Sequence, residues 1–261
     1  MLVRTWNLFH GNSVPPGRTA YLEQIVRLAT ADRPDVLLFQ EVPLWAFHRL
    51  ESWAGMTAFT QVAARALLGA TIGGKVTQLD PGLLRSAVSG QGNAILLDRS
   101  LEPFDYHALV LNPRSFRGEQ AARLGLGPAE SFAWAKERRV LQVIRAALPD
   151  GRRALIANLH ATAYAADLRL AEAEVRRAAE FYLQLARSGE IDVFGGDFNL
   201  REGSEVIRFV REQGFSRAGP GVDHLLVRGA PASAPRTWPE ERRHVHGQLV
   251  SDHAPLEVQV A

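Results

Sequence analysis

The sequence contains no cysteine, which excludes disulfide bonds and thiolate metal sites and leaves the cellular compartment open. It also has no run of about 20 apolar residues, the length that a helix needs to cross a bilayer. Residues 1–7 carry one charge and are followed by no long apolar core, so they do not resemble a secretory signal. We therefore expect a cytoplasmic protein that makes no stable insertion into a membrane.

Lysine is almost absent, because Lys75 and Lys136 are the two that the 261 residues contain. Arginine therefore supplies nearly all the positive charge of a chain with net charge +2 and a pI near 9.3. A guanidinium group matches phosphate oxygens with a planar, bidentate fork. A GC-rich genome would enrich arginine equally well, so the charge permits a phosphate-bearing substrate without arguing for one.

The remaining composition is that of an ordinary globular protein, with 46% apolar and 22% charged residues. A chain of this length can form one large α/β domain or two small ones. We find no linker, low-complexity segment or internal repeat in it. We therefore expect a single domain that spans residues 1–261.

What the chain does contain is a short apolar run that ends in a polar pair, IDVFGGDFNL over Ile191–Leu200. The apolar residues and the two glycines are typical of a buried strand that closes in a tight turn. Asp197 and Asn199 stand two residues apart, so they point the same way where the chain is extended. Oxygen ligands of this kind suit a hard cation such as Mg²⁺. The same residues could instead cap a helix that begins near Ser204, and locally this alternative stays open.

Apolar patterning predicts the other elements. The expected helices are Thr19–Thr30, a short one from Pro43 to about Trp53, Tyr164–Arg187 and Ser204–Gln213. The expected strands are Leu2–Leu8, Asp35–Phe39, Asn93–Leu97, Arg138–Leu148, Arg153–His160, Ile191–Gly195, Val222–Val227 and Ala254–Val260. The turn Pro149-Asp150-Gly151 predicts that the strands on either side of it form a hairpin.

Two segments do not fit this alternation and are interpreted as insertions, at about residues 56–90 and 111–135. The first has few charges and could be a pair of short helices over the core or an apolar lid beside a site. The second contains prolines and three arginines and is expected to be irregular. Arg236–Arg243 is arginine-rich and is expected to be a surface loop.

Polar residues stand at the end of nearly every predicted strand. Taken singly, each has a structural explanation as a turn former, a surface acid or a core histidine. No local rule of folding asks for all of them, whereas an active site built on a rigid β scaffold does. The residues are Asn7, Glu41, His160, Asp197, Asn199, Asp223 and the pair Asp252-His253.

These residues lie in a set of ordered motifs, W-N, Q-E, N-L-H, G-G-D-F-N, V-D-H and S-D-H-A-P, that runs from Trp6 to Pro255. The set resembles the endonuclease/exonuclease/phosphatase superfamily, typified by pancreatic deoxyribonuclease. The resemblance implies an α/β fold with four layers, in which two mixed β-sheets pack face to face and helices lie on the outside. The predicted order of elements is compatible with this sandwich but does not select it unaided.

The resemblance also implies a role for each oxygen ligand. Glu41 looks like the main ligand of Mg²⁺, or of Mn²⁺ in its place, helped by Asn7 and Asp252. Asp197 and Asn199 look like the residues that orient the attacking water and hold the scissile phosphate. Such a cation would neutralise the charge of the non-bridging phosphate oxygens.

Two histidines complete the implied site. His253 looks like a histidine held by Asp223, and His160 stands where the deoxyribonuclease branch has a histidine proposed as general acid. Imidazole suits proton transfer to a leaving alkoxide, because its pKa lies near neutrality. In that branch an acid supports the general-acid histidine, whereas the nearest match here is Asn93, a neutral group.

The phosphate-contacting arginine of the family has two candidates in Glu137-Arg138-Arg139, of which we prefer Arg138. We find no equivalent of the tyrosine that some abasic-site nucleases use. These departures leave the substrate open more than the chemistry. The leading hypothesis is a Mg²⁺-dependent phosphodiesterase that cleaves DNA or RNA.

The alternatives are a phosphatase or phospholipase of the same superfamily, acting on a phosphoinositide or a sphingomyelin-like substrate, and a catalytically inactive binding module. A nucleic-acid enzyme is expected to carry a basic stripe, whereas the arginines here are spread along the chain. Nothing in the sequence points to a protein partner.

Overall fold

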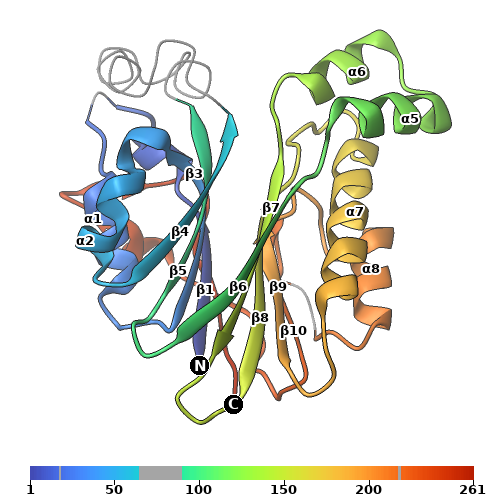
Figure 1. The fold of residues 1–261 in the computed structure, drawn as a ribbon. Helices are drawn as coiled ribbons and strands as arrows, with labels where there is room; N and C mark the ends of the chain where they lie inside the picture. The colour runs from blue at the N-terminus through green and yellow to red at the C-terminus, as the bar shows by residue number, and fades with distance from the viewer. Residues whose placement is uncertain (18, 65–89, 217–218) are drawn as a thin grey trace.

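Two large β-sheets lie face to face in the centre of the molecule, and helices cover the outer side of each (Figure 1). The computed structural model describes residues 1–17, 19–64, 90–216 and 219–261. The first sheet has the order β11 (Arg236–Thr237), β14 (Leu256–Gln259), β1 (Leu2–Asn7), β3 (Val36–Pro43), β5 (Gln91–Leu97) and β4 (Thr57–Ala64). The second has the order β10 (Asp223–Arg228), β9 (Ile191–Asp197), β8 (Arg153–His160), β7 (Val140–Ala147) and β6 (Glu102–Val110).

Both large sheets are mixed, because β1 pairs with β3 and β8 pairs with β9 in parallel, while the other pairs in these sheets are antiparallel. A third, small sheet contains β12 (His244–Val245), β13 (Gln248–Val250) and β2 (Ser13–Val14). The four-layered α/β sandwich predicted from the resemblance is thus confirmed. The hairpin of β7 and β8 is confirmed as well.

The helices are short apart from one. On the outer side of the first sheet lie α1 (Leu22–Thr30), α2 (Leu50–Ala54) and the 3₁₀ turn Leu44–Arg49. On the outer side of the second lie α7 (Arg169–Leu185) and α8 (Glu205–Glu212), and at its upper end lie α5 (Arg114–Leu124) and α6 (Pro128–Ala135). Two further 3₁₀ turns are Phe9–Gly11 and Glu240–Arg243. In the described ranges, every helix is too short or too polar to cross a membrane.

The central strands are apolar on both faces, which explains their continuous hydrophobic runs. In β3, Val36 and Leu38 point into the core between the sheets, whereas Leu37 and Phe39 point into the core under α1 and α2. Strand β8 alternates in the same way, with Ile156 in the central core and its neighbours in the core under α7 and α8. The period of two along each strand therefore builds three apolar layers.

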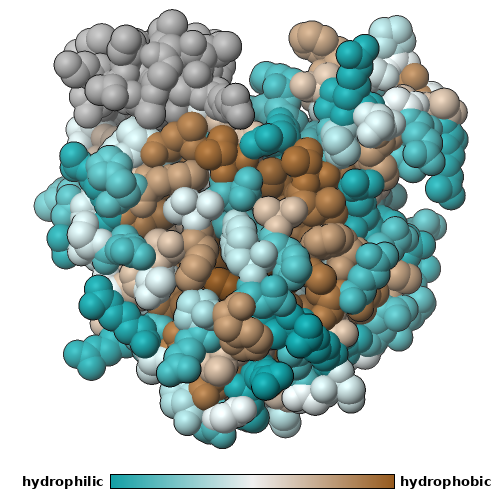
Figure 2. Space-filling model, viewed as in Figure 1, coloured by the Kyte–Doolittle hydropathy of each residue, from teal (hydrophilic) through white to brown (hydrophobic). Residues whose placement is uncertain are grey.

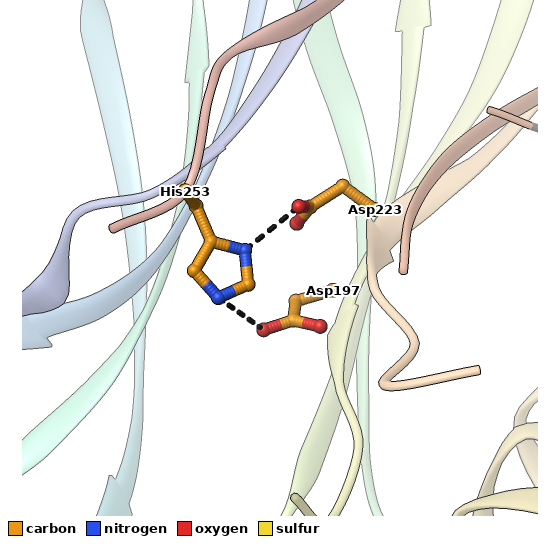
Figure 3. Close-up of side chains that lie close together, drawn as sticks. All are labelled: Asp197, Asp223 and His253. Carbon is orange, nitrogen blue, oxygen red and sulfur yellow. Dashed lines mark hydrogen bonds and ion pairs between the residues drawn. The ribbon is translucent and has the colours of Figure 1, made fainter. Parts of the chain in front are cut away.

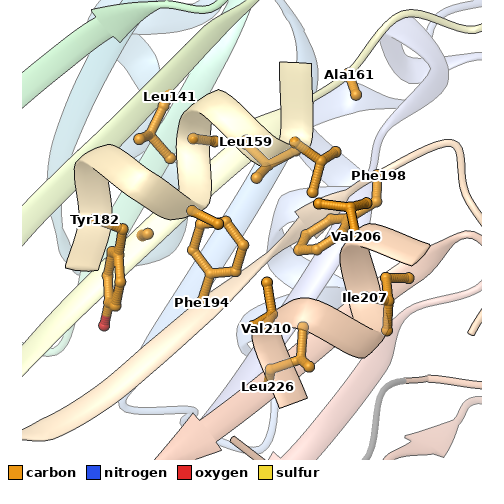
Figure 4. Close-up of a cluster of buried hydrophobic side chains, with 14 of the residues drawn as sticks. Leu141, Leu159, Ala161, Tyr182, Phe194, Phe198, Val206, Ile207, Val210 and Leu226 are labelled. Carbon is orange, nitrogen blue, oxygen red and sulfur yellow. The ribbon is translucent and has the colours of Figure 1, made fainter. Parts of the chain in front are cut away.

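Helix α7 packs an apolar stripe against the second sheet, in a core that also contains Phe194 and residues of α8 (Figure 4). Its buried residues recur at the spacing of three and four expected for one helix face. They are Leu170, Ala171, Glu174, Val175, Ala178, Ala179 and Tyr182. The helix begins at Arg169, five residues later than the pattern predicts.

The start of helix α8 excludes the alternative that Asp197 and Asn199 cap this helix. Its N-cap is Ser204, whose side-chain oxygen accepts a hydrogen bond from the backbone N–H of Ile207. Asp197 and Asn199 lie before that cap, so they are not the residues that begin the helix.

Several predicted elements need correction. Residues 57–64, expected in a pair of short helices or a lid, form the edge strand β4, while residues 65–89 lie outside the described part of the chain. The segment 111–135 is not irregular, because it contains α5 and α6. The predicted loop at 236–243 contains the short strand β11 and a 3₁₀ turn.

Strand β6 and the small sheet were not expected. The residues of β6 are mostly exposed or half-buried, so they lack the apolar run by which the central strands are recognised. In Figure 2, hydrophobic residues interrupt the hydrophilic surface over the edge strands β4 and β6, which face the viewer. Phe104 and Tyr106 of β6 are among the large exposed side chains.

Packing of α7 predicts the effect of a charge in its stripe. Val175→Asp places a carboxylate where the wild-type side chain is fully buried, and we expect it to lower the free energy of unfolding by several kcal/mol. Gln184→Asp, on the exposed side of the same helix, should change it by no more than about 0.5 kcal/mol. Urea unfolding followed by circular dichroism measures both, and equal stability of the two variants would contradict the buried position of Val175.

Candidate active site

Polar side chains from both large sheets meet at one edge of the sandwich, the edge away from the two chain termini (Figure 1). Asn7 ends β1, His160 ends β8 and Asp197 ends β9. Asp223 begins β10, which runs antiparallel to β9 and places Asp223 directly opposite Asp197. Glu41 lies near the end of β3 in the other sheet. The carboxyl ends of the parallel strands thus deliver residues far apart in the sequence to one place.

Asp223, His253 and Asp197 form a connected group (Figure 3). Nδ1 of His253 lies 2.7 Å from Oδ2 of Asp223, and Nε2 faces Oδ2 of Asp197 at 3.9 Å. Burial alone would lower the pKa of His253, but the hydrogen bond and the negative charge of Asp223 outweigh it and raise this pKa to about 10. The imidazole is therefore positively charged at neutral pH.

Asp197 is buried and holds its carboxylate in a fixed orientation. Oδ2 accepts a hydrogen bond from Nδ2 of Asn7 at 2.9 Å, and Oδ1 accepts one from the backbone N–H of Asn199 at 3.0 Å. Nε2 of His160 lies 3.5 Å from Oδ2. Burial, followed by the charge of Asp223, raises the pKa of Asp197 to about 6, and the charge of His253 partly offsets this rise.

Glu41 stands between two imidazoles. Its Oε2 lies 3.3 Å from Nε2 of His10, and its Oε1 lies 3.9 Å from Nε2 of His160. Burial raises the pKa of Glu41 to about 7, although a hydrogen bond from Asn7 and the charge of Arg139 act in the opposite direction. The hydrogen bond and the nearby positive charge therefore do not offset the cost of burying the charged form of Glu41.

Backbone strain gathers at the same edge. Glu41 has φ +53° at a register shift of β3 against β5, and Asn199 has φ +51°. His10 and Ser251 also have positive φ, at +53° and +60°. Residues other than glycine adopt such values rarely and at a cost, and they concentrate at functional sites. Here they lie within or next to the segments that carry the site residues.

The donor chemistry at this edge fits a hard divalent cation. Glu41, Asn7 and Asp252 offer carboxylate and amide oxygens, the ligands that Mg²⁺ prefers. The raised pKa values of Glu41 and Asp197 show two carboxylates that a nearby cation would stabilise in their charged form. Ligand atoms of Asp197, Asp223 and His253 also lie within 4.8 Å of one another, but a charged His253 has no free nitrogen lone pair for a cation.

The remaining predicted residues are placed as follows. Nδ2 of Asn199 donates to the backbone oxygen of Ala161, and Asp252 is exposed, with a charge that acts on Glu41 and His253. Nδ2 of Asn93 donates to the backbone oxygen of Val140. Arg138, preferred as the phosphate ligand, donates instead to the backbone oxygens of Val62 and Ala63 on β4.

Arg139 is the arginine that faces the histidine of β8. Its Nη1 lies 3.1 Å from Nδ1 and 3.2 Å from Nε2 of His160, and its Nη2 pairs with Glu137 at 2.9 Å. Burial and then the charge of Arg139 lower the pKa of His160 well below its usual value. A guanidinium group thus lies beside His160, where the resemblance implied an acid.

Sequence reasoning missed His10 and did not prefer Arg139. The only signal for His10 was its position three residues after Asn7, in a segment interpreted as a loop. The two adjacent arginines precede β7 and are chemically identical, so no local pattern separates them. The backbone N–H of Arg139 donates to Oδ1 of Asn112, a residue distant in the sequence, so the contact belongs to the tertiary structure.

Solved structures of similar fold cover the whole chain. An endonuclease/exonuclease/phosphatase from Beutenbergia cavernae aligns with 100% of this chain and 71% of its own, at 14% identity and a TM-score of 0.69. Truncated Caenorhabditis elegans TDP2 aligns over 99% and 96%, at 15% identity and a TM-score of 0.64. A mannosyl-6-phosphatase of Bacteroides thetaiotaomicron aligns over 100% and 99%, at 13% identity and a TM-score of 0.65. At these identities the likeness concerns the fold.

Comparison of the sequence with protein-family profiles identifies the family. No curated protein sequence matches the chain. The sequence profile of the endonuclease/exonuclease/phosphatase family matches residues 5–253, which include every polar residue of the strand ends described above. The chain therefore belongs to the endonuclease/exonuclease/phosphatase family and is a hydrolase of phosphate esters.

Proposed function

We propose that the protein is a Mg²⁺-dependent phosphodiester hydrolase, a nuclease that cleaves DNA or RNA by attack of water on phosphorus, and that Mn²⁺ can replace Mg²⁺. The observation that carries this proposal is the connected series Asn7, Asp197, His253 and Asp223, joined by two hydrogen bonds and, between Asp197 and His253, a 3.9 Å ion pair, with Glu41 of the first sheet beside it. The site thus combines the fixed carboxylate of Asp197, the charged imidazole of His253 and the carboxylate of Glu41, whose burial is not offset by nearby positive charge.

The chain's own residues supply three functions in this mechanism. Asp197 orients the attacking water and accepts its proton, because both of its oxygens are held in place by Asn7 and by the backbone of Asn199. His253, kept charged by Asp223, binds a non-bridging oxygen of the phosphate. His160 would donate a proton to the leaving oxygen from its imidazolium form; burial and Arg139 disfavour that form, and the negative charge of a bound phosphate would favour it.

Glu41, Asn7 and Asp252 would hold the cation. When bound, it supplies charge neutralisation on the phosphate and polarises phosphorus toward attack. Oδ1 of Asn7 accepts a hydrogen bond from the backbone N–H of Phe9, which orients the amide oxygen. Ser251 fixes the segment that carries Asp252, because its hydroxyl donates to the backbone oxygen of Asn7 and accepts from the backbone N–H of His253.

A second candidate function is hydrolysis of a phosphate monoester. A terminal phosphate carries more negative charge than a diester, so a second buried cation beside the site would favour it. Arg139 is such a cation, and the mannosyl-6-phosphatase fold match spans almost the whole of both chains. We rank this candidate below the diesterase, because His160 stands where the deoxyribonuclease branch has a histidine proposed as general acid.

A turnover screen separates the candidates. Its substrates are plasmid DNA, RNA, bis-p-nitrophenyl phosphate, p-nitrophenyl phosphate, mannose 6-phosphate and phospholipid vesicles, each with Mg²⁺, Mn²⁺ or EDTA. We expect turnover of the nucleic acids and the diester, abolished by EDTA. Faster turnover of monoesters would favour the phosphatase. Hydrolysis confined to vesicles would favour the phospholipase, and no turnover at all would favour an inactive binding module.

Glu41→Gln tests the cation site. The amide keeps the shape of the side chain but removes the charge that attracts the cation, so we expect Mg²⁺ affinity to fall by at least about tenfold and turnover to be lost. The variant should remain folded. Calorimetric titration with Mg²⁺ measures the affinity, with Glu23→Gln, an exposed carboxylate on α1, as the control. An unchanged isotherm would remove Glu41 from the cation site.

The variants His160→Ala and His253→Ala should differ in how their loss of turnover depends on the leaving group of the substrate. Turnover should fall on the order of 10²–10⁴-fold in both variants on an alkyl diester. On an aryl diester, whose p-nitrophenolate leaves without a proton, His160→Ala should recover much of its activity. His253→Ala should stay inactive, because the phosphate has lost its charged partner.

Kinetic comparison of the variants on both diesters makes this measurement, with His48→Ala on an exposed turn as the control. Equal losses of His160→Ala on both substrates would show that His160 does not protonate the leaving group.

A further inference from the structure

A fully buried carboxylate, that of Glu174, interrupts the apolar stripe of α7. Its residue has no exposed surface, and its neighbours on the same face are Ala171, Val175 and Ala178. Moving a carboxylate out of water costs several kcal/mol unless hydrogen bonds or charges replace the lost hydration. Burial raises the pKa of Glu174, and the charge of Arg139 acts against that rise. The mechanism above gives this group no role.

Three donors from two other segments satisfy the carboxylate. Oε1 accepts hydrogen bonds from Nε1 of Trp134 at 2.6 Å and from the hydroxyl of Thr162 at 2.8 Å. Oε2 accepts one from the backbone N–H of Thr162 at 2.6 Å. Short hydrogen bonds of this kind to a charged acceptor are roughly twice as strong as neutral ones. Glu174 therefore ties helix α6 and the segment after β8 to α7.

His160, the last residue of β8, stands two residues before Thr162. Between them, the backbone N–H of Ala161 donates to the backbone oxygen of Asp197, and the backbone oxygen of Ala161 accepts from Nδ2 of Asn199. Contacts from β9, from Asn199 and from α7 thus hold Ala161 and Thr162, the two residues that follow His160. The contact from α7 is the hydrogen-bond pair with Glu174.

Helix α6 is followed closely in the sequence by Arg139, whose guanidinium contacts the imidazole of His160. Nδ2 of Asn112 donates to the backbone oxygens of Trp134 and Glu137, and Oδ1 of Asn112 accepts from the backbone N–H of Arg139. The indole of Trp134 also contacts Phe116 of α5 edge to face, with ring centroids 5.9 Å apart. The position of Trp134 is therefore linked to that of Arg139.

We infer that Glu174 is a positioning residue, which sets the placement of the Arg139 guanidinium against the His160 imidazole by anchoring both of their segments to α7. A carboxylate suits this task because two oxygens are needed to accept three donors. Glutamine offers one oxygen, and its NH₂ group would face a donor. The effect on turnover rests on the proposed function, whereas the placement of His160 does not.

The test compares Glu174→Gln with Glu190→Gln. Glu190 is also buried, pairs with Nε of Arg145 at 2.8 Å, and lies directly before β9, at the opposite end of that strand from Asp197. Both variants remove a buried charge, so they share a purely structural cost. Two readouts are measured: the ring resonances of His160 in ¹³C-histidine-labelled protein, identified by their loss in His160→Gln, and kcat and KM on an alkyl diester.

We expect Glu174→Gln to shift the His160 ring resonances and to lower kcat about 10- to 100-fold, with KM changed less than about twofold. Glu190→Gln should leave both unchanged. If Glu174→Gln does not fold, Trp134→Phe removes one of the three donors and should shift the same resonances.

Unshifted His160 resonances in a folded Glu174→Gln variant would overturn the inference, as would equal shifts in Glu190→Gln. If the wild type hydrolyses no diester, the proposed function fails, and the resonances alone still decide whether Glu174 positions His160.

Discussion

A hydrogen-bonded bridge between the two sheets underlies the rest of the structure. Nδ2 of Asn158, on β8, donates to the backbone oxygens of Phe39 and Ala94 in the other sheet, both at 3.0 Å. Nε2 of Gln40 donates to Oδ1 of Asn158 at 2.7 Å. Both side chains are fully buried. Apolar packing between sheets tolerates sliding, whereas buried amides are stable only where their partners stand opposite them, so the bridge specifies one alignment of the sheets.

That alignment determines the site, because the bridge residues adjoin it in the sequence. Gln40 directly precedes Glu41, and Asn158 stands two residues before His160. A second link, from Asn7 to Asp197, joins the sheets within the site itself. The carboxylates and imidazoles consequently lie on two rigid supports whose separation is fixed. The two links therefore hold Glu41 and Asp197, two carboxylates with raised pKa values, near each other.

The side of the site near α5 and α6 is built differently. There the residue beside His160 is Arg139, and its position depends on Asn112, Trp134 and Glu174 in separate elements. The strand-end residues and Arg139 all lie within the range that the family profile matches, and the group beside His160 is the guanidinium of Arg139. The strand ends therefore supply the carboxylates and imidazoles of the site, and a separate set of contacts from α6 and α7 positions the guanidinium.

The sequence by itself determined the central strands, the hairpin, the main helix α7 and the polar residue at each strand end, because alternation, turn chemistry and helical periodicity are local properties. The ordered motifs supplied the family and, through it, the sandwich. Edge strands β4 and β6 were not predicted, since half-exposed strands carry no continuous apolar run. Only the tertiary structure decided that Arg139 and not Arg138 lies beside His160, that Asn93 is bonded to Val140, and that Glu174 is satisfied by Trp134 and Thr162. These outcomes depend on hydrogen-bond partners 12 to 47 residues away in the sequence, and no local pattern contains them.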